Sequence, residues 1–379
     1  MIYFDNAATG GKKPDRVLTA VSSAVRLCAN PGRSGHKLSL SCAKLVLSCR
    51  NALNDFFGGY GYERVIFTKN CTEALNVAIL GTLKKGDHVV TTCMEHNSVL
   101  RPLEFLKKSG VITYDVCPLA EDSGSGARNL SLPTLFSLIR PNTRMVIVTT
   151  ASNVTGAIPP FDKLREILPP QTLLLCDGAQ GGGHLDIDMK KSGIDFLAIA
   201  GHKGMMGIQG SGALLFSERI DPAPLLYGGT GSMSLSLDMP DFYPDGLEAG
   251  TLAFPAILSL LEGTRELTLH ASEIQKQTYA LTAYFLKGLK TLSAYTSYSK
   301  PNPCGIVAFS HKRFPSEHVA ELLSAKYDIA VRGGFHCAPL MHEALGTLDS
   351  GLVRASFSAF NSESEINRLL FALEEIDQT

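Results

Sequence analysis

The chain has 379 residues, of which 45% are hydrophobic and 19% are charged, and its formal net charge is −1. This composition is typical of a globular protein with a large apolar core and argues against a disordered chain. A net charge near zero supplies no basic field for a nucleic acid or an anionic membrane, so we expect neither as a partner.

The beginning of the chain, MIYFDNAATGGKKP, has no charged head followed by an apolar core, so we expect no signal peptide. No apolar run is long enough to cross a bilayer. Nine cysteines are present, an odd number, and none of them forms a C-x-x-C pair. The cysteines therefore indicate free thiols in the reducing cytoplasm, with no disulfide framework and no metal site.

From about residue 15 to residue 216, short apolar or β-branched runs alternate with helical patterns such as CTEALNVAILGTLKK and SLPTLFSLIR. The strands that we expect are residues 64–68, 88–92, 111–116, 145–151, 172–177, 196–200 and 212–216. Nearly continuous apolar strands separated by helices predict an α/β fold with a mainly parallel, seven-stranded sheet covered on both faces. In such sheets ligands bind beyond the carboxyl ends of the strands.

After the last of these strands the pattern changes. Residues 227–251 are rich in Gly, Ser and Pro and lack periodicity, which predicts a long functional loop. A long helix is expected from residue 255 to about residue 270, and the last helix opens with a capping box, Ser362 and Glu365. We expect a large domain over residues 15–251. We expect residues 252–379, together with residues 1–14, to form a smaller α+β domain.

A histidine and a lysine lie side by side after an apolar strand, in FLAIAGHKGMMG. The lysine, Lys203, follows residues 196–200, and the glycines around it let a bulky ligand approach. A partly desolvated lysine can form a Schiff base, which suggests pyridoxal 5'-phosphate. That cofactor needs an anion beside its pyridine nitrogen, and Asp177 ends the apolar strand 172–177. The structural alternative for Asp177 is an N-cap.

The cofactor's phosphate needs backbone amides at the start of a helix. The stretch FTKNCTEALNVA predicts a strand, a turn and a helix whose first turn holds Cys71 and Thr72. His96 and Asn153 each follow an expected strand, where a histidine can stack on the pyridine ring and an asparagine can bind its phenolic oxygen. Each residue alone is compatible with an ordinary loop. A parallel sheet brings the ends of its strands together at one edge. These residues, with Asp177 and Lys203, all lie at or just after the ends of expected strands, so together they predict a pyridoxal-phosphate site.

The chain resembles the class V aminotransferase-like, fold-type I pyridoxal-phosphate enzymes. More narrowly, it resembles cysteine desulfurases of the NifS/SufS kind, including selenocysteine lyases. The motifs that carry this resemblance appear in order along nearly the whole chain: DNAAT (5–9), TKNCTEALN (68–76), EHNS (95–98), SNVTG (152–156), DGAQ (177–180), GHKG (201–204), EAGT (248–251), RGGFHCAP (332–339) and VRASFSAFN (353–361).

The resemblance implies a role for each residue around the cofactor ring. Lys203 would be the Schiff-base lysine, and Asp177 would pair with the pyridinium nitrogen. His96 would stack on the ring and shuttle protons on the substrate side. Gln180 and Asn153 would lie near the phenolic oxygen, with Asn153 also near the substrate.

The resemblance also implies residues for the phosphate and the substrate. Cys71, mainly through its amide, would hold the phosphate together with Thr72 and His202. Thr251 would reach the phosphate from the partner subunit, because active sites in this family form at the interface of a homodimer. Arg354 would clamp the substrate carboxylate, which a guanidinium binds with two parallel hydrogen bonds.

Cys337, in AVRGGFHCAPLMHEALG, indicates which reaction the cofactor serves. The flanking glycines, the adjacent His336 and the start of a short helix each favour the thiolate, although a buried packing role is the alternative. We expect a cysteine desulfurase that converts L-cysteine to L-alanine and takes the sulfur on Cys337 as a persulfide. We also expect a sulfur-acceptor protein, such as one of iron–sulfur cluster assembly, that takes the sulfur from Cys337.

Three alternatives stay open at this point. A selenocysteine lyase would act on L-selenocysteine, another class V aminotransferase-type reaction would leave Cys337 incidental, and a non-catalytic scaffold would only bind the cofactor. A nicotinamide-dinucleotide fold is rejected, because the glycine-rich residues 207–212 lead into a strand and do not open a helix.

Overall fold

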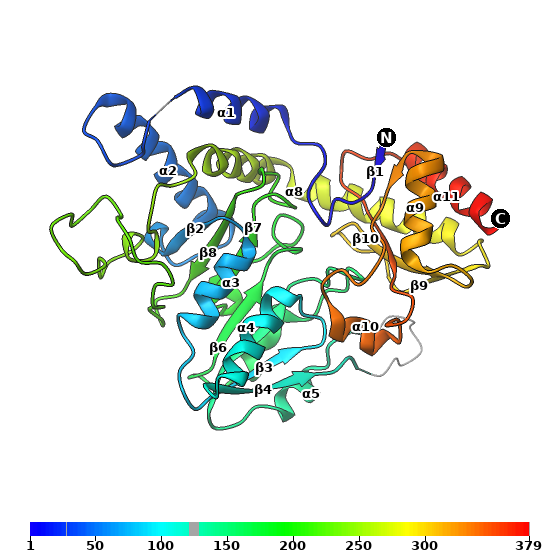
Figure 1. The fold of residues 1–379 in the computed structure, drawn as a ribbon, viewed down its shortest axis with the longest axis horizontal. Coiled ribbons are helices and arrows are strands. Elements are labelled where there is room, and N and C mark those ends of the chain that lie inside the picture. The colour runs from blue at the N-terminus through cyan, green and yellow to red at the C-terminus, as the bar shows by residue number, and fades with distance from the viewer. Residues whose placement is uncertain (28, 121–128, 379) are drawn as a thin grey trace.

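The structure, a computed structural model, describes residues 1–27, 29–120 and 129–378. These residues form a larger α/β part and a smaller α+β part (Figure 1). Within them, a seven-stranded sheet has the order β2-β8-β7-β6-β5-β3-β4. Its strands are β2 (Val65–Thr68), β3 (Asp87–Thr92), β4 (Ile112–Cys117), β5 (Thr143–Thr149), β6 (Leu173–Asp177), β7 (Phe196–Ala200) and β8 (Gly212–Phe216).

Strand β8 is antiparallel to its neighbours β2 and β7, and the remaining pairs in the sheet are parallel. The predicted α/β fold with a mainly parallel seven-stranded sheet is therefore confirmed. Every predicted strand of the sheet is present, and no predicted bound differs from the observed one by more than two residues. Local pattern places a strand better than it places the strand's last residue.

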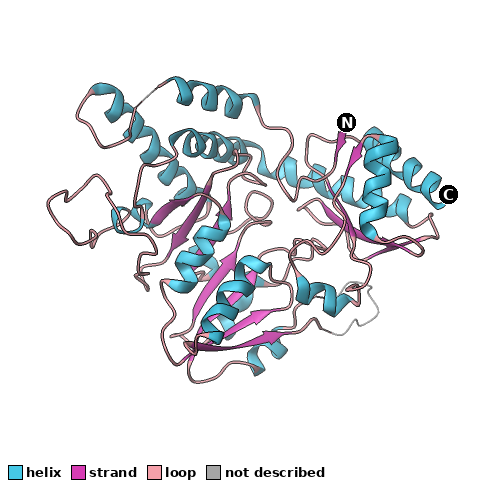
Figure 2. Cartoon of the chain, in the orientation of Figure 1, coloured by secondary structure: helices cyan, strands magenta, loops and turns pink. Residues whose placement is uncertain are grey.

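The sheet is buried on both faces because consecutive residues of its central strands contribute to different cores. In β6, Leu174 and Cys176 belong to one apolar cluster, whereas Leu173 and Leu175 belong to another. Successive side chains of a strand point to opposite faces, so a strand that is apolar throughout must be covered twice. Figure 2 shows helices on both sides of the sheet.

The helices of the larger part precede its first strand or lie between its strands along the chain. In the described residues of the larger part they are α1 (Asp15–Arg26), α2 (Lys37–Phe56), α3 (Cys71–Leu80), α4 (Asn97–Lys108), α5 (Leu132–Ser137), α6 (Leu164–Ile167) and α7 (Met189–Ser192). Short 3-10 turns complete this part: η1 (Tyr62–Arg64), η2 (Phe161–Lys163) and η3 (Asp245–Leu247).

The smaller part combines the two ends of the chain. Strand β1 (Ile2–Tyr3) pairs in parallel with β11 (Ile329–Ala330). A three-stranded antiparallel sheet has the order β12-β10-β9. Its strands are β9 (Tyr295–Ser297), β10 (Ile306–His311) and β12 (Val353–Ser356), and the helices around them are α9 (Ser316–Tyr327), α10 (Pro339–Leu345) and α11 (Glu363–Asp377). The predicted capping box at the start of α11 is confirmed.

Helix α8 (Phe254–Leu289) links the two parts and is much longer than predicted. Its first half packs Leu260 and Leu267 into the larger core, and its second half packs Phe285 into the smaller core. The expected end near His270 is wrong. Residues 268–270 are exposed, so the apolar pattern pauses, but the helix continues past Ile274, which packs against the larger core, to the smaller core. The domain boundary at residues 251/252 stays a prediction.

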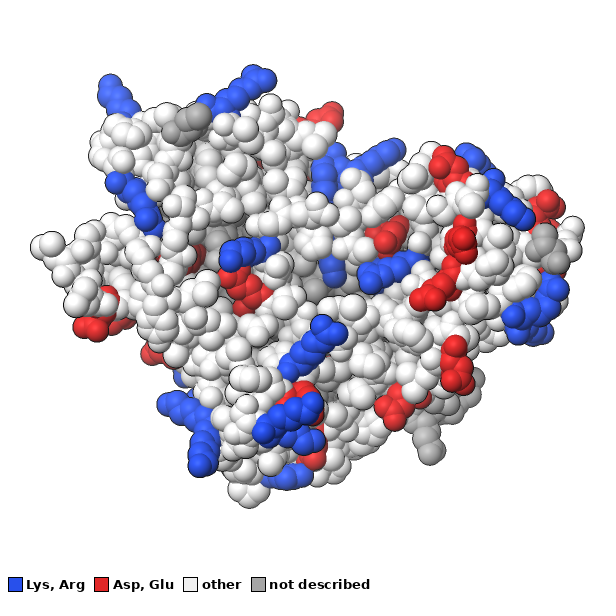
Figure 3. All heavy atoms as spheres, in the orientation of Figure 1, with Lys and Arg blue, Asp and Glu red and all other residues white. Residues whose placement is uncertain are grey.

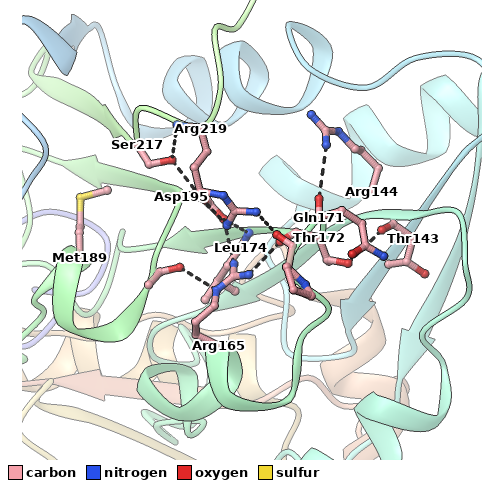
Figure 4. Close-up of polar contacts among 12 residues, drawn as sticks. Thr143, Arg144, Arg165, Gln171, Thr172, Leu174, Met189, Asp195, Ser217 and Arg219 are labelled. Carbon is pink, nitrogen blue, oxygen red and sulfur yellow. Dashed lines mark hydrogen bonds and ion pairs between the residues drawn. The ribbon is translucent and has the colours of Figure 1, made fainter.

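A buried polar network at the amino-terminal edge of the sheet has a structural role (Figure 4). Asp195 precedes β7 and accepts hydrogen bonds from Arg165 and Arg219, from the amide of Leu174 and from the hydroxyl of Ser217. These contacts join the ends of β6, β7 and β8. They satisfy a carboxylate that would otherwise be costly to bury, at the edge opposite to the one where ligands bind.

Lysine, arginine and acidic side chains intermix on the face of the molecule that Figure 3 shows, without a region of one sign. Among the described residues, no helix is both long and apolar enough to cross a membrane.

Candidate active site

The carboxyl ends of the central parallel strands converge on one cavity of about 500 Å³ that opens to solvent. Asp177 is the last residue of β6, and His202 and Lys203 follow β7 directly. The loops after β3 and β5 bring His96 and Asn153 to the same place. The sequence-predicted residues that line this cavity are Cys71, Thr72, His96, Asn153, Asp177, Gln180, His202 and Lys203.

Asp177 supplies a buried carboxylate to the cavity, with 3% of its surface exposed. Its Oδ1 atom accepts a hydrogen bond from the amide of Ala179 at 2.9 Å and one from the thiol of Cys71 at 3.4 Å. Burial, together with the nearby Asp177, raises the pKa of the Cys71 thiol well above its usual range. Cys71 is therefore a protonated donor to Asp177, a role that the sequence analysis did not assign to its side chain.

Lys203 lies in a tight turn whose shape requires glycine on both sides. A Cβ atom on Gly201 would come within 2.1 Å of the Ser211 hydroxyl, and one on Gly204 would come within 2.4 Å of the Gly182 carbonyl. Burial lowers the pKa of the Lys203 amine, and the neighbouring Arg354 lowers it further. Because the neutral amine is favoured, Lys203 can act as a nucleophile or a base.

The start of α3 forms one end of the cavity. The side chain of Asn70 caps the helix by accepting the amide of Glu73 at 2.9 Å, which leaves the amides of Cys71 and Thr72 without intrahelical partners. The hydroxyl of Thr72 lies 2.8 Å from that of Ser98. Backbone and hydroxyl donors at a helix N-terminus form a binding site for an anion such as a phosphate.

His202 lies beside this helix start as a neutral donor. Burial and the nearby Lys203 and Lys13 lower the pKa of its ring to about 4. Its Nδ1 atom lies 3.1 Å from the hydroxyl of Thr9, which fixes the ring from the amino-terminal segment.

His96 is held in one orientation because its side chain caps α4. The Nδ1 atom of His96 accepts the amide of Ser98 at 3.0 Å, so the neutral ring carries its proton on Nε2. Burial lowers the pKa of the ring, which favours this neutral form. His96 therefore offers an Nε2–H donor.

Arg354 is 1% exposed and lies next to the cavity, although its side chain is not part of the lining. Its Nη2 atom pairs with Asp5 at 2.9 Å, its Nη1 atom donates to the carbonyl of Asn153 at 2.9 Å, and its Nε atom is buried without a partner. A second guanidinium, Arg332, follows β11, and its backbone pairs with that of Arg354. The sequence analysis gave no role to Arg332 or Asp5, although both lie in motifs that it quoted.

Cys337 is exposed, and its carbonyl accepts the amide of Asn97, next to His96, at 2.8 Å. The expected influence of His336 on the thiolate is wrong. The ring of His336 is 3% exposed, and burial together with Arg354 lowers its pKa to about 2, so it carries no positive charge. Local sequence showed that His336 is adjacent but not that its ring turns into the core.

Thr251 is exposed and does not line the cavity that holds Lys203. It borders a separate hollow beside Phe67. A buried ion pair fixes the turn before it, because Glu248 binds Arg50 at 2.9 Å and 2.5 Å and accepts the amide of Phe67 at 2.6 Å. Within one chain, the structure does not bring Thr251 to the other predicted residues.

Glu95 is a buried carboxyl group that the sequence analysis missed. It is fully buried, and its Oε1 atom accepts hydrogen bonds from the hydroxyl of Thr92 at 2.7 Å and the amide of Thr149 at 2.9 Å. Its Oε2 atom is buried without a partner. Burial, together with the nearby Asp177, raises the pKa of Glu95 to about 8, so the group is mainly protonated at neutral pH.

We expect the charge state of Glu95 to make stability depend on pH. Its folded-state pKa of about 8 is above its ordinary value of 4.5, so the unfolded state loses this proton first as the pH rises. The free energy of unfolding should then fall by up to about 1.4 kcal/mol per pH unit between these values. Glu95→Gln should remove this contribution. Urea unfolding of both proteins from pH 5 to 8 tests it, and parallel pH profiles would contradict it.

Comparisons with known proteins support the resemblance over the whole chain. The family described as Aminotransferase class-V matches residues 2–369. A protein named "Probable cysteine desulfurase" from Pyrococcus abyssi is 33% identical, over 99% of this chain and 94% of its own. A "Cysteine desulfurase" from Pectobacterium carotovorum is 29% identical, over 99% of this chain and 93% of its own.

Solved structures show the same likeness. The apo structure of a cysteine desulfurase from Thermococcus onnurineus has a TM-score of 0.90 and 32% identity, and covers 100% of this chain and 94% of its own. The structure of an Escherichia coli cysteine desulfurase, titled as an S-sulfonic acid form, has a TM-score of 0.88 and 25% identity. It covers 99% of this chain and 94% of its own.

Proposed function

The chain belongs to the aminotransferase class-V family, and we infer from its site that it is a pyridoxal-phosphate-dependent cysteine desulfurase. It converts L-cysteine to L-alanine and takes the sulfur on Cys337 as a persulfide. The observation that carries this proposal is the single cavity lined by Lys203 and Asp177, with the loop of Cys337 hydrogen-bonded at its edge. The names of the relatives favour this reaction over selenocysteine lyase.

The residues of the cavity fit pyridoxal 5'-phosphate. The amine of Lys203 would hold its aldehyde carbon, the carboxylate of Asp177 would face its ring nitrogen, and the start of α3 with Thr72 would hold its phosphate. The buried Oδ1 atom of Asn153, which has no partner, lies in the same wall. When bound, the cofactor supplies an electron sink for negative charge at the α-carbon of the substrate.

The side chains around this cavity have different roles in the proposed reaction. Arg354 and Arg332 place two positive charges beside Lys203, which suits the carboxylate of an amino acid. The amine of Lys203, whose pKa burial lowers, would remove the α-proton. Asp177 would favour a proton on the ring nitrogen of the bound cofactor. The Nε2–H group of His96 donates a hydrogen bond on the substrate side.

The sulfur transfer is balanced by the substrate and the enzyme alone. The thiolate of Cys337 attacks the substrate sulfur, a sulfur–sulfur bond forms, and the carbon–sulfur bond of the substrate breaks. The carbon fragment keeps the electron pair and gains protons to become alanine. Cys337 is exposed, so its persulfide is accessible to a sulfur-acceptor protein.

The active protein is a homodimer in this proposal, in which Thr251 reaches the phosphate in the partner's cavity. Two observations support it. Thr251 is exposed at the end of a turn that Glu248 and Arg50 fix. Leu235 and Leu237 are fully exposed on the preceding loop, which extends away from the body of the chain, and a partner subunit would cover them in the dimer.

The test is incubation with L-cysteine followed by mass analysis of the cysteine-containing peptides. We expect one added sulfur atom on the peptide of Cys337 and alanine as the product. Cys337→Ala should still bind the cofactor and the substrate but release almost no sulfide. Cys42→Ala, which removes a buried thiol, is the matched control. Sulfide release by Cys337→Ala at the rate of the natural protein, or a keto acid as the product, would contradict the proposal.

A further inference from the structure

Two hydrogen bonds attach the loop that carries Cys337 to the cavity wall. Their donors lie in two separate segments, one after β5 and one after β3. The side-chain amide of Asn153, after β5, donates to the carbonyl of His336 at 2.7 Å. The backbone amide of Asn97, after β3, donates to the carbonyl of Cys337 at 2.8 Å. Two consecutive carbonyl groups of the loop are thus held by two separate parts of the large domain.

The held segment has an unfavourable backbone conformation. His336 and Cys337 have φ angles of 51° and 56°, in the left-handed region that residues other than glycine rarely adopt. A strained segment keeps its shape only where surrounding contacts hold it. The two hydrogen bonds to its carbonyl groups are such contacts, so the position of Cys337 depends on them.

Asn153 is placed to connect this loop with the cavity. It is 7% exposed, it lines the cavity together with Asp177 and Lys203, and its own carbonyl accepts from Arg354. The carbonyl of His336 requires a donor, which orients the amide and leaves the buried Oδ1 atom without a partner. One side chain therefore contacts the loop of Cys337 and also presents an unsatisfied atom beside the cavity.

We propose that Asn153 is a positioning residue that holds the strained loop of Cys337 against the cavity. This inference rests on the proposed function, in which Cys337 takes the sulfur. Loss of the Asn153 amide removes one of the two hydrogen bonds, and the backbone of His336 and Cys337 relaxes away from the left-handed region. The thiol, which is already exposed, then moves more freely and meets a reagent in solution more often.

The experiment measures the rate at which iodoacetamide alkylates Cys337 in the full-length protein without substrate, by mass analysis of its peptide. Asn153→Ala should raise this rate about fivefold, as the loss of one hydrogen bond allows. Asn153→Asp keeps the shape of the side chain but cannot donate to the carbonyl of His336, so it should raise the rate at least as much. Faster amide hydrogen exchange over residues 334–338 should accompany both changes.

Two controls distinguish movement of the Cys337 loop from a loss of stability of the whole fold. Gln180→Ala removes another amide of the cavity wall, one that donates to the carbonyl of Ala7 and not to the loop. It should leave the alkylation of Cys337 unchanged. The buried thiols Cys42 and Cys49 report on the rest of the fold and should stay unreactive in every variant.

An unchanged alkylation rate in both Asn153 variants would overturn the proposal. An equal increase of the Cys337 alkylation rate in Gln180→Ala, or new alkylation of Cys42 and Cys49, would also overturn it. Either result would show that the change is not confined to the Cys337 loop. Alkylation requires no turnover, so its result is independent of the persulfide assay. A missing persulfide in the natural protein, together with faster alkylation in the variants, would reject the proposed function and keep the loop attachment.

Discussion

Replacing Lys203 by alanine should abolish the visible absorption of the bound cofactor and reduce sulfur release from L-cysteine by roughly a thousandfold or more. No other amine lines the cavity with Asp177 in the described residues. The variant loses both the covalent attachment point and the base. Spectra of the purified proteins, with turnover measured as alanine formed, provide the test.

Lys13→Ala is the matched control for this prediction. Burial lowers the pKa of Lys13 to about 8, and its amine donates to the carbonyl of His202, next to Lys203, at 3.0 Å, so it is a competing amine for the same chemistry. It does not line the cavity with Asp177, and its loss should leave the visible band in place. A visible band that persists in Lys203→Ala and disappears in Lys13→Ala would reverse the assignment.

Asp177→Asn should lower turnover by about two to three orders of magnitude while the protein stays folded. An asparagine keeps the Oδ1 acceptor for the amide of Ala179 and for the thiol of Cys71, so the local structure survives. It removes the negative charge that favours a proton on the ring nitrogen of the cofactor. The measurement is turnover at saturating L-cysteine, together with the absorption of the bound cofactor.

Cys71→Ala is a useful comparison for Asp177→Asn. It removes only a neutral donor to the same carboxylate, so we expect a loss of less than about tenfold. Equal losses in the two variants would show that the packing around Asp177, and not its charge, supports the reaction.

Local sequence predicted the elements of the sheet because its central strands are apolar along nearly their whole length. A run such as LLLCD has no polar face, so it can only lie in a sheet covered on both sides, and the parallel arrangement follows from the helices between strands. The same arrangement explains why Asp177, His96, Asn153 and Lys203 could be grouped from the sequence. Their places at strand ends fix a common edge.

Helix α8 shows where this reasoning fails. Its buried face passes from the larger core, which Ile274 still contacts, to the smaller core at Leu281. A periodicity argument interprets the exposed residues 268–270 as the end of the helix. Local preference carries no information about a second core that is assembled from residues far away in the chain.

What the sequence determined by itself is therefore the sheet, the common edge of its strands and the chemistry of the residues placed there, since these depend on period and on residue type. Only the tertiary structure decided which way individual side chains turn and what surrounds them. In the folded chain, the ring of His336 is buried in the core, and the side-chain amide of Asn153 donates to the carbonyl of His336 in the loop of Cys337. Glu95 is buried with one carboxyl oxygen that has no hydrogen-bond partner. Burial and hydrogen-bond partners come from contacts between distant segments, and these contacts set the charge states on which the site depends.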